Sequence, residues 1–100
     1  MSIKRMKITL HTIMGIKDIV GQRLTEIDLP CGSTIAAFLA YMKDKWGDQL
    51  STQLFDPEHG EVLPHVRIMV NGQTIHYLAG MQTVLEEGDE VLILPPVSGG

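Results

Sequence analysis

The chain has 100 residues, of which 44% are hydrophobic and 20% are charged. This length and balance are typical of one folded domain, and they exclude a disordered chain or a collagen-like repeat. The net charge is −4 and only 5% of residues are aromatic. Nucleic-acid binding is therefore not expected, because phosphate contacts need a basic surface and single strands need stacking rings.

Membrane insertion and cysteine chemistry are also constrained by the composition. The longest apolar run falls far short of the ~18 residues of a membrane span, and the first residues lack the apolar core of a signal peptide. We therefore expect a soluble, cytoplasmic protein with no membrane partner.

The single cysteine, Cys31, cannot form an internal disulfide. No Cys or His lies near it at ligand spacing, so no metal site is expected.

The charges are divided unevenly along the chain. Residues 1–55 carry seven basic and five acidic residues, whereas residues 56–100 carry Arg67 against seven acidic residues. The two parts are thus about +2 and −6 in charge. We expect the acidic part to prefer a basic protein partner.

Two strands are predicted near the start of the chain. Apolar and polar residues alternate from Lys4 to Leu10, which is the period of a half-buried strand. A loop containing Gly15 and Gly21 follows, and the same alternation predicts a second strand from Leu24 to Leu29. Together the two strands can form an opening hairpin with a wide loop.

A helix is predicted after Pro30 and Gly32, which end the second strand. Ser33 or Thr34 can cap it, since either hydroxyl can accept a hydrogen bond from a free N–H of the first turn. Gly47 is well placed to end it. The apolar residues recur with helical spacing and form one stripe that must pack against a sheet: Ile35, Phe38, Leu39, Met42 and Trp46.

The middle of the chain is less regular until a further hairpin begins. A short helical turn can form around Leu50, Leu54 and Phe55. A strand is predicted from His65 to Val70, and Asn71-Gly72 then favours a type I′ turn, whose two central residues need positive φ. A short strand from Gln73 to Ile75 is expected to pair back.

The final strand is predicted from Glu90 to Leu94. It follows a connection with a helical turn, over residues 77–85, and a turn at Glu87-Gly88-Asp89. Its apolar residues occupy both faces, which favours a central strand that is buried on both sides.

This order of strands around one long helix indicates an α+β fold of the β-grasp type. The expected sheet is mixed, has about four to five strands and carries one principal helix packed across it. We assign residues 1–94 to this domain and residues 95–100 to an extended, mobile tail.

The tail has a composition suited to reaching a partner. It reads Pro95-Pro96-Val97-Ser98-Gly99-Gly100. Two prolines favour an extended backbone, and six residues can span about 20 Å. Glycine lacks a Cβ atom, so a Gly-Gly end can pass through a narrow slot and expose the last carbonyl to a partner's reactive groups. The alternative interpretation is a flexible end without function.

Four motifs in the second half of the chain form a distinctive set. They are Val70-Asn71-Gly72, Leu78-Ala79-Gly80-Met81-Gln82-Thr83-Val84-Leu85, Gly88-Asp89-Glu90-Val91 and Pro95-Pro96-Val97-Ser98-Gly99-Gly100. This set resembles the MoaD/ThiS family of sulfur carriers, to which the small subunit of molybdopterin synthase belongs. The resemblance is strongest over residues 65–100, and the first loop and Cys31 depart from the family pattern.

This resemblance implies a ubiquitin-like domain whose Gly100 carboxylate is the reacting group. Members of the family are adenylated there by an ATP-using, ubiquitin-activating-like partner, and sulfur then displaces AMP to leave a thiocarboxylate. In molybdopterin synthase the tail, here Pro95, Pro96, Val97, Ser98 and Gly99, inserts into the large subunit. The resemblance thus implies a carrier that is not an enzyme by itself, with no bound cofactor and no metal.

Three other functions remain open. The chain could carry sulfur for thiamine or another product, or it could be a ubiquitin-like modifier that is joined to lysines through Gly100. It could also be an interaction module with an inert tail. The absence of a phosphate-binding glycine loop indicates that the chain does not bind ATP itself.

For the other reactive side chains, we favour structural roles over chemical ones. Cys31 precedes a helix N-terminus, where a redox role is conceivable, but an incidental loop thiol is favoured. The histidines have neither metal-ligand spacing nor a nearby nucleophile, and the acidic run beside the last strand is favoured as a solvated turn. These residues are His11, His59, His65, His76, Glu86, Glu87, Asp89 and Glu90.

Overall fold

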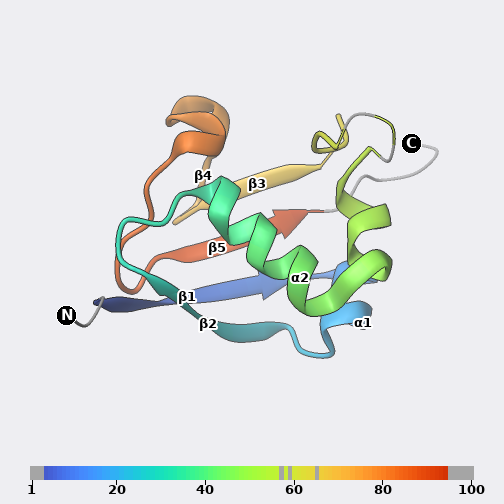
Figure 1. Ribbon diagram of the computed structural model, residues 1–100, viewed down its shortest axis with the longest axis horizontal. Coiled ribbons are helices and arrows are strands. Elements are labelled where there is room, and N and C mark those ends of the chain that lie inside the picture. The colour runs from blue at the N-terminus through green and yellow to red at the C-terminus, as the bar shows by residue number, and fades with distance from the viewer. Residues whose placement is uncertain (1–3, 57, 59, 65, 95–100) are drawn as a thin grey trace.

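The computed structural model describes residues 4–56, 58, 60–64 and 66–94. These residues form a five-stranded mixed sheet with the strand order β2-β1-β5-β3-β4 (Figure 1). The strands and helices are β1 (Arg5–Thr12), α1 (Met14–Val20), β2 (Leu24–Pro30), α2 (Ile35–Leu54), β3 (Arg67–Val70), β4 (Gln73–Thr74), two short 3₁₀ helices, η1 (Ile75–Tyr77) and η2 (Gly80–Gln82), and β5 (Glu90–Leu94).

Two antiparallel hairpins flank the central strand of the sheet. The first joins β1 to β2, as predicted, and its register pairs Ile8 with Ile27. The second joins β3 to β4 through Asn71 and Gly72, whose φ angles of 51° and 86° confirm the predicted type I′ turn. β5 lies between the hairpins, parallel to β1 and antiparallel to β3.

Helix α2 covers one face of the sheet and supplies much of the core (Figure 1). Thr34 caps the helix, since its Oγ1 accepts a hydrogen bond from the N–H of Ala37 at 3.3 Å. The predicted stripe is buried except at Trp46, which packs partly exposed against the core. At Gly47 the backbone leaves the helical region, with φ of 70°, and the helix is kinked. The sequence predicted an end at Gly47 and a separate helical turn after it. In the structure the helix continues beyond the kink, and its second segment buries Leu50 and Leu54.

The predicted loop after the first strand was wrong, because residues Met14–Val20 form helix α1. Ile16, Ile19 and Val20 have helical spacing and all contact the core, with Ile16 fully buried. The two glycines suggested a loop, but Gly15 lies in the first turn, and Gly21 ends the helix with φ of 92°. A glycine inside a helix costs only about 1 kcal/mol, which burial of Ile16 offsets.

The boundaries of several strands differ from those predicted. β1 extends to Thr12, because His11 and Thr12 pair with β5. β3 begins at Arg67, while His65 lies outside the described residues. Ile75 belongs to η1 rather than to β4. Neither helix of the described chain has the length and hydropathy that a membrane-spanning helix requires.

Candidate functional site

The candidate site begins where β5 ends, at Leu94, and we call this position the root of residues 95–100. β5 is held on both sides, by β1 over Thr9–Thr12 and by β3 up to the pair Arg67–Leu94. Val91 and Ile93 are fully buried beneath α2. The segment that follows therefore starts from the middle of a packed sheet. The predicted site residues themselves, Pro95, Pro96, Val97, Ser98, Gly99 and Gly100, lie outside the described residues.

Side-chain hydrogen bonds hold the turn that leads into β5. Asp89 accepts from Asn71 Nδ2 through Oδ1 and from the N–H of Glu86 through Oδ2, each at 2.9 Å. Asn71 Oδ1 accepts from the N–H of Glu90 at 2.9 Å, and Glu87 Oε2 accepts from the N–H of Lys7 at 3.0 Å. The acidic run is thus a surface turn, as favoured from the sequence, and two of its four acidic side chains, Glu87 and Asp89, accept hydrogen bonds that help to fix the start of the central strand.

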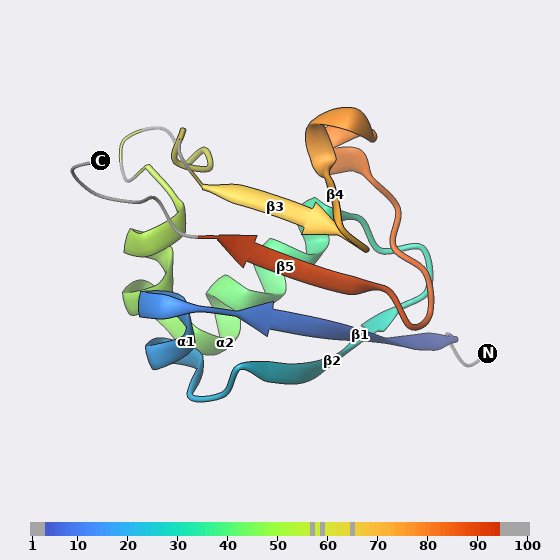
Figure 2. The same ribbon diagram turned by 180° about the vertical axis from the view of Figure 1, so that it is seen from behind.

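The prediction that β5 is buried on both sides was wrong. Leu92 and Leu94 point away from α2 and are only half-buried. Figure 2 shows the opposite face of the sheet, where no described element lies in front of β1, β5 and β3. The sequence predicts that the apolar residues on this second face belong to the core, but no described element covers them.

We call this surface the open face, and a row of cross-strand neighbours defines it. Leu92 of β5 pairs with His11 of β1 on one side and with Met69 of β3 on the other. The row continues to Leu24 on β2 and to Thr74 on β4. Leu24 is 49% exposed. Leu92, Met69 and Leu94 thus form a short apolar stripe in the middle of the open face, with Leu24 beyond His11, and the stripe reaches the start of residues 95–100 at Leu94.

Two ion pairs and a histidine–glutamate contact border the apolar stripe along β1. Arg5 Nε lies 3.0 Å from Asp28 Oδ1, and Lys7 Nζ lies 3.7 Å from Glu26 Oε1. His11 Nδ1 lies 3.6 Å from Glu90 Oε1. An apolar centre with a polar, partly neutralised rim is the composition found at protein–protein interfaces.

The remaining candidate side chains do not form a second site. Cys31 is exposed and its N–H donates to the carbonyl of Lys4 at 2.9 Å. His11 belongs to the open face and His76 is exposed, whereas His59 and His65 lie outside the described residues. Within the part of the chain that the structure describes, no three His, Cys, Asp or Glu residues are placed to hold a metal ion.

Comparisons with known proteins agree with this geometry. The ThiS family model matches residues 15–100. The chain is also 34% identical over 95 residues to small archaeal modifier protein 3 of Haloferax volcanii, which covers 95% of this chain and 100% of the relative. The chain belongs to the ThiS family.

Two further similar proteins are a named sulfur carrier and a solved structure with the same fold. CysO of Mycobacterium tuberculosis, a sulfur carrier protein, is 33% identical over 70 residues, covering 69% of this chain and 74% of the relative. The solution structure of the HVO 2177 protein of Haloferax volcanii superposes with a TM-score of 0.81 at 32% identity, covering 96% of this chain and 88% of that one. These findings confirm the expected ubiquitin-like β-grasp fold and place the chain among the ubiquitin-like sulfur carriers and modifiers.

Proposed function

We propose that this ThiS-family chain carries sulfur on Gly100 and donates it as the small subunit of molybdopterin synthase, in the biosynthesis of the molybdenum cofactor. The observation that supports the proposal is the position of β5. It is the central strand of the sheet, its start is fixed by the Asn71–Asp89 contacts, and it leads directly into residues 95–100. A rigid root of this kind lets a partner that grips the domain place the reacting end accurately.

The proposed chemistry explains why a partner is needed. A carboxylate resists attack because its charge is delocalised and its oxygen is a poor leaving group. The Gly100 carboxylate attacks the α-phosphorus of ATP on a ubiquitin-activating-like partner, giving an acyl-adenylate and pyrophosphate. Hydrosulfide sulfur, delivered by a sulfurtransferase, then attacks the acyl carbon. The bond to AMP breaks, AMP leaves with the former carboxylate oxygen, and a thiocarboxylate remains.

The open face supplies the surface by which such partners would hold the domain. Its apolar stripe ends at Leu94, so a protein that covers Leu92 and Met69 also receives residues 95–100. In the proposed synthase, the large subunit takes the tail into its active site. The thiocarboxylate sulfur attacks a carbon of the pterin precursor and displaces an oxygen substituent there, because sulfur is polarizable and a good nucleophile. Water then hydrolyses the bond between the acyl carbon and sulfur, which restores the Gly100 carboxylate.

A second candidate function is that of a ubiquitin-like protein modifier. The relative named small archaeal modifier protein 3 matches 95% of this chain and favours it. A lysine amine would then attack the same acyl-adenylate, AMP and a proton would leave, and Gly100 would end in an isopeptide bond.

The test is the intact mass of the chain after incubation with an activating enzyme, ATP and a sulfur donor. We expect a gain equal to the replacement of one oxygen by sulfur, and no gain in a matched chain that lacks Gly99 and Gly100. Adding the large subunit and the pterin precursor should return the mass to its starting value. No gain with any activating enzyme would contradict the sulfur-carrier proposal, and conjugates on a denaturing gel would favour the modifier.

A further inference from the structure

The outer edge of β2 is a long strand edge that the described chain leaves uncovered. β2 is the first strand in the sheet order, and each of its seven residues pairs with a residue of β1 in one continuous register. No described element lies along the side of β2 that faces away from β1, as Figure 1 and Figure 2 both show. Native proteins commonly shorten, bulge or cover such an edge, because it can pair with another strand.

Hydrogen bonds at the two ends of β2 establish which main-chain groups point outward. The N–H of Thr12 donates to the carbonyl of Arg23, and the N–H of Cys31 donates to the carbonyl of Lys4, each at 2.9 Å. In an antiparallel pair, successive residues direct their main-chain groups alternately toward the partner strand and away from it. Residues 23, 25, 27, 29 and 31 therefore face β1, and the residues of β2 that face outward before Pro30 are Leu24, Glu26 and Asp28.

Most of these outward groups are free to pair. Within the described chain, the N–H groups of Leu24, Glu26 and Asp28 have no acceptor, and the carbonyls of Leu24 and Glu26 have no donor. The carbonyl of Asp28 accepts from Arg5 Nη2 at 2.9 Å. The edge thus presents three donors and two acceptors at the spacing of a strand, which is the pattern that an added strand requires.

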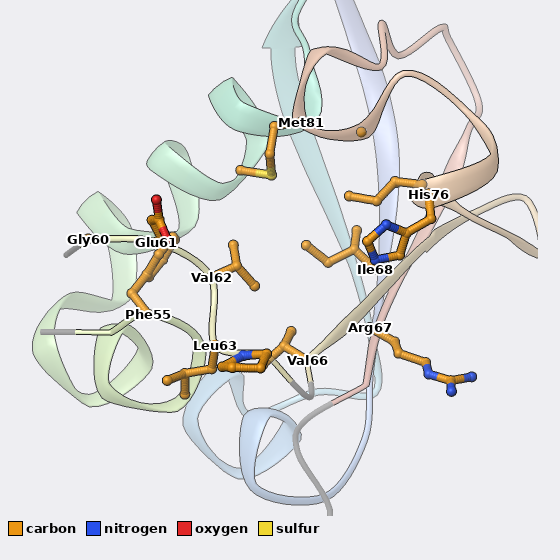
Figure 3. A pocket seen from close by; sticks show the side chains of 13 residues that line it. Phe55, Gly60, Glu61, Val62, Leu63, Val66, Arg67, Ile68, His76 and Met81 are labelled. Carbon is orange, nitrogen blue, oxygen red and sulfur yellow. The ribbon is translucent and has the colours of Figure 1, made fainter.

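The other edge of the sheet has a different form. β4 has only two residues, Gln73–Thr74, and the chain then enters η1. Beside it, a cavity of about 520 Å³ opens between the start of β3, residues 60–64 and the two 3₁₀ helices. Figure 3 shows Val62, Ile68 and Met81 around the cavity. This edge is too short for a row of main-chain groups like that of β2.

The side chains along the outer edge of β2 are acidic on the open face. Glu26 and Asp28 have side chains that are 65% and 55% exposed. Each carboxylate directs one oxygen toward β1: Glu26 Oε1 lies 3.7 Å from Lys7 Nζ, and Asp28 Oδ1 lies 3.0 Å from Arg5 Nε. The second oxygen of each carboxylate has no partner within the residues that the structure describes. It can accept a hydrogen bond from a cationic side chain on a neighbouring strand.

The same charges disfavour pairing with a second copy of the chain. Two β2 strands that pair antiparallel about residue 26 place Glu26 opposite Glu26, and pairing about residue 27 places Glu26 opposite Asp28. Like charges directly opposite each other destabilise a sheet. A strand with lysine or arginine at alternate positions meets opposite charges at these positions instead, so the edge selects a basic partner.

We propose that the outer edge of β2 binds an extended, basic segment of a partner protein, which adds a further strand to the sheet. The segment exchanges main-chain hydrogen bonds with the outward groups of β2, and its cationic side chains lie beside Glu26 and Asp28. Its alternate side chains lie on the covered face, beside Thr25 and the buried Ile27, where apolar residues extend the core. The site uses neither Leu92 and Met69 nor the reacting end, so it goes beyond the proposed function.

The test is hydrogen exchange measured by amide NMR on the full chain, with a probe peptide. The peptide has the length of β2, alternates valine with lysine and has blocked ends. At saturating peptide, exchange at the amides of Leu24, Glu26 and Asp28 should slow by about tenfold or more, because they gain acceptors. The amides between them, which already bond to β1, should change little. This alternation distinguishes strand addition from attraction between charges alone.

Two variants of Glu26 separate the main chain from the charge. Glu26→Pro removes an outward N–H, and an edge strand tolerates proline there, so affinity for the lysine peptide should fall by about tenfold or more. Glu26→Lys keeps the N–H but reverses the charge. It should weaken binding of the lysine peptide and strengthen binding of a matched glutamate–valine peptide. The control is Glu61→Lys, which makes the same charge change at the cavity and should leave binding at β2 unchanged.

Three outcomes would overturn the proposal. The first is no binding of the lysine peptide, or binding that protects the amides of β2 without alternation. The second is equal affinity for the lysine and glutamate peptides. The third is protection of the outward amides that rises with protein concentration in the absence of peptide, which would assign the edge to a second copy of the chain. None of these results bears on thiocarboxylate formation, which is measured separately by intact mass.

Discussion

The two faces of the sheet are formed by the same strands but differ in how deeply their side chains are buried. On the covered face, Ile8, Ile27 and Val91 are completely buried beneath α2. On the open face, their immediate neighbours Leu92 and Met69 stay half-exposed, and ion pairs replace core contacts. Strand alternation thus gives the two faces different degrees of burial, and under the proposed function the open face serves recognition. A substitution on one face should leave the other largely unaffected.

The largest expected effect is on the covered face. Phe38→Ala removes a fully buried ring from α2 and should lower the free energy of unfolding by about 3–5 kcal/mol. Urea unfolding followed by circular dichroism would measure it. The matched control, Leu24→Ala, is half-exposed on the open face and should cost under about 1 kcal/mol. Equal losses in both variants would contradict the division between faces.

The next effect concerns recognition. Leu92→Glu places a charge in the centre of the apolar stripe and should weaken binding of an activating partner by about tenfold or more, because the carboxylate must be desolvated. Titration calorimetry would measure the affinity, with unfolding in urea as the check on stability. Unchanged affinity would exclude the open face as the docking surface.

The turn that anchors β5 should show an intermediate effect on stability. Asn71 has φ of 51° and its side chain makes two hydrogen bonds. Asn71→Ala should therefore cost about 1–2 kcal/mol. Asn71→Gly loses the same hydrogen bonds but accepts positive φ, so it should cost less. If the two variants unfold at the same urea concentration, the positive φ at residue 71 contributes nothing to the loss of stability.

The smallest effect is expected from the ion pairs of the open face. Arg5 and Asp28 are each about half-exposed, so a double-mutant cycle should give a coupling energy below about 1 kcal/mol. It should shrink further in high salt. A coupling well above this value would mean that the open face contributes to stability as the covered face does.

Local signals in the sequence were sufficient to predict much of this fold. The last strand, Glu90–Leu94, has the predicted bounds, and Thr34 and Asn71-Gly72 act as predicted because caps and turns depend on neighbouring residues. Helix α1 was missed since its stability comes from burying Ile16 against distant parts of the chain. Long-range packing of this kind leaves little trace in a short window of sequence.

The candidate site was predicted less completely. Pro95 to Gly100 were selected from composition and resemblance, and they remain a prediction. The open face was missed because an apolar residue on a strand has the same pattern whether a helix or a partner protein covers it. The cavity was also missed, since its walls come from segments between Phe55 and Met81 that only the fold brings together.

The central position of β5 also affects how the chain matures during synthesis. In the described sheet, no strand of the hairpin β1–β2 pairs with a strand of the hairpin β3–β4. Only β5, which lies between the hairpins, joins them. β5 follows the other four strands along the chain, so the sheet can close only after residues 90–94 have left the ribosome. Pairing of β1 with so distant a strand makes this closure a late step. A truncated product that stops before Glu90 would lack the strand that joins the two hairpins and so could not form the closed sheet, and under the proposed function it would also lack the reacting end.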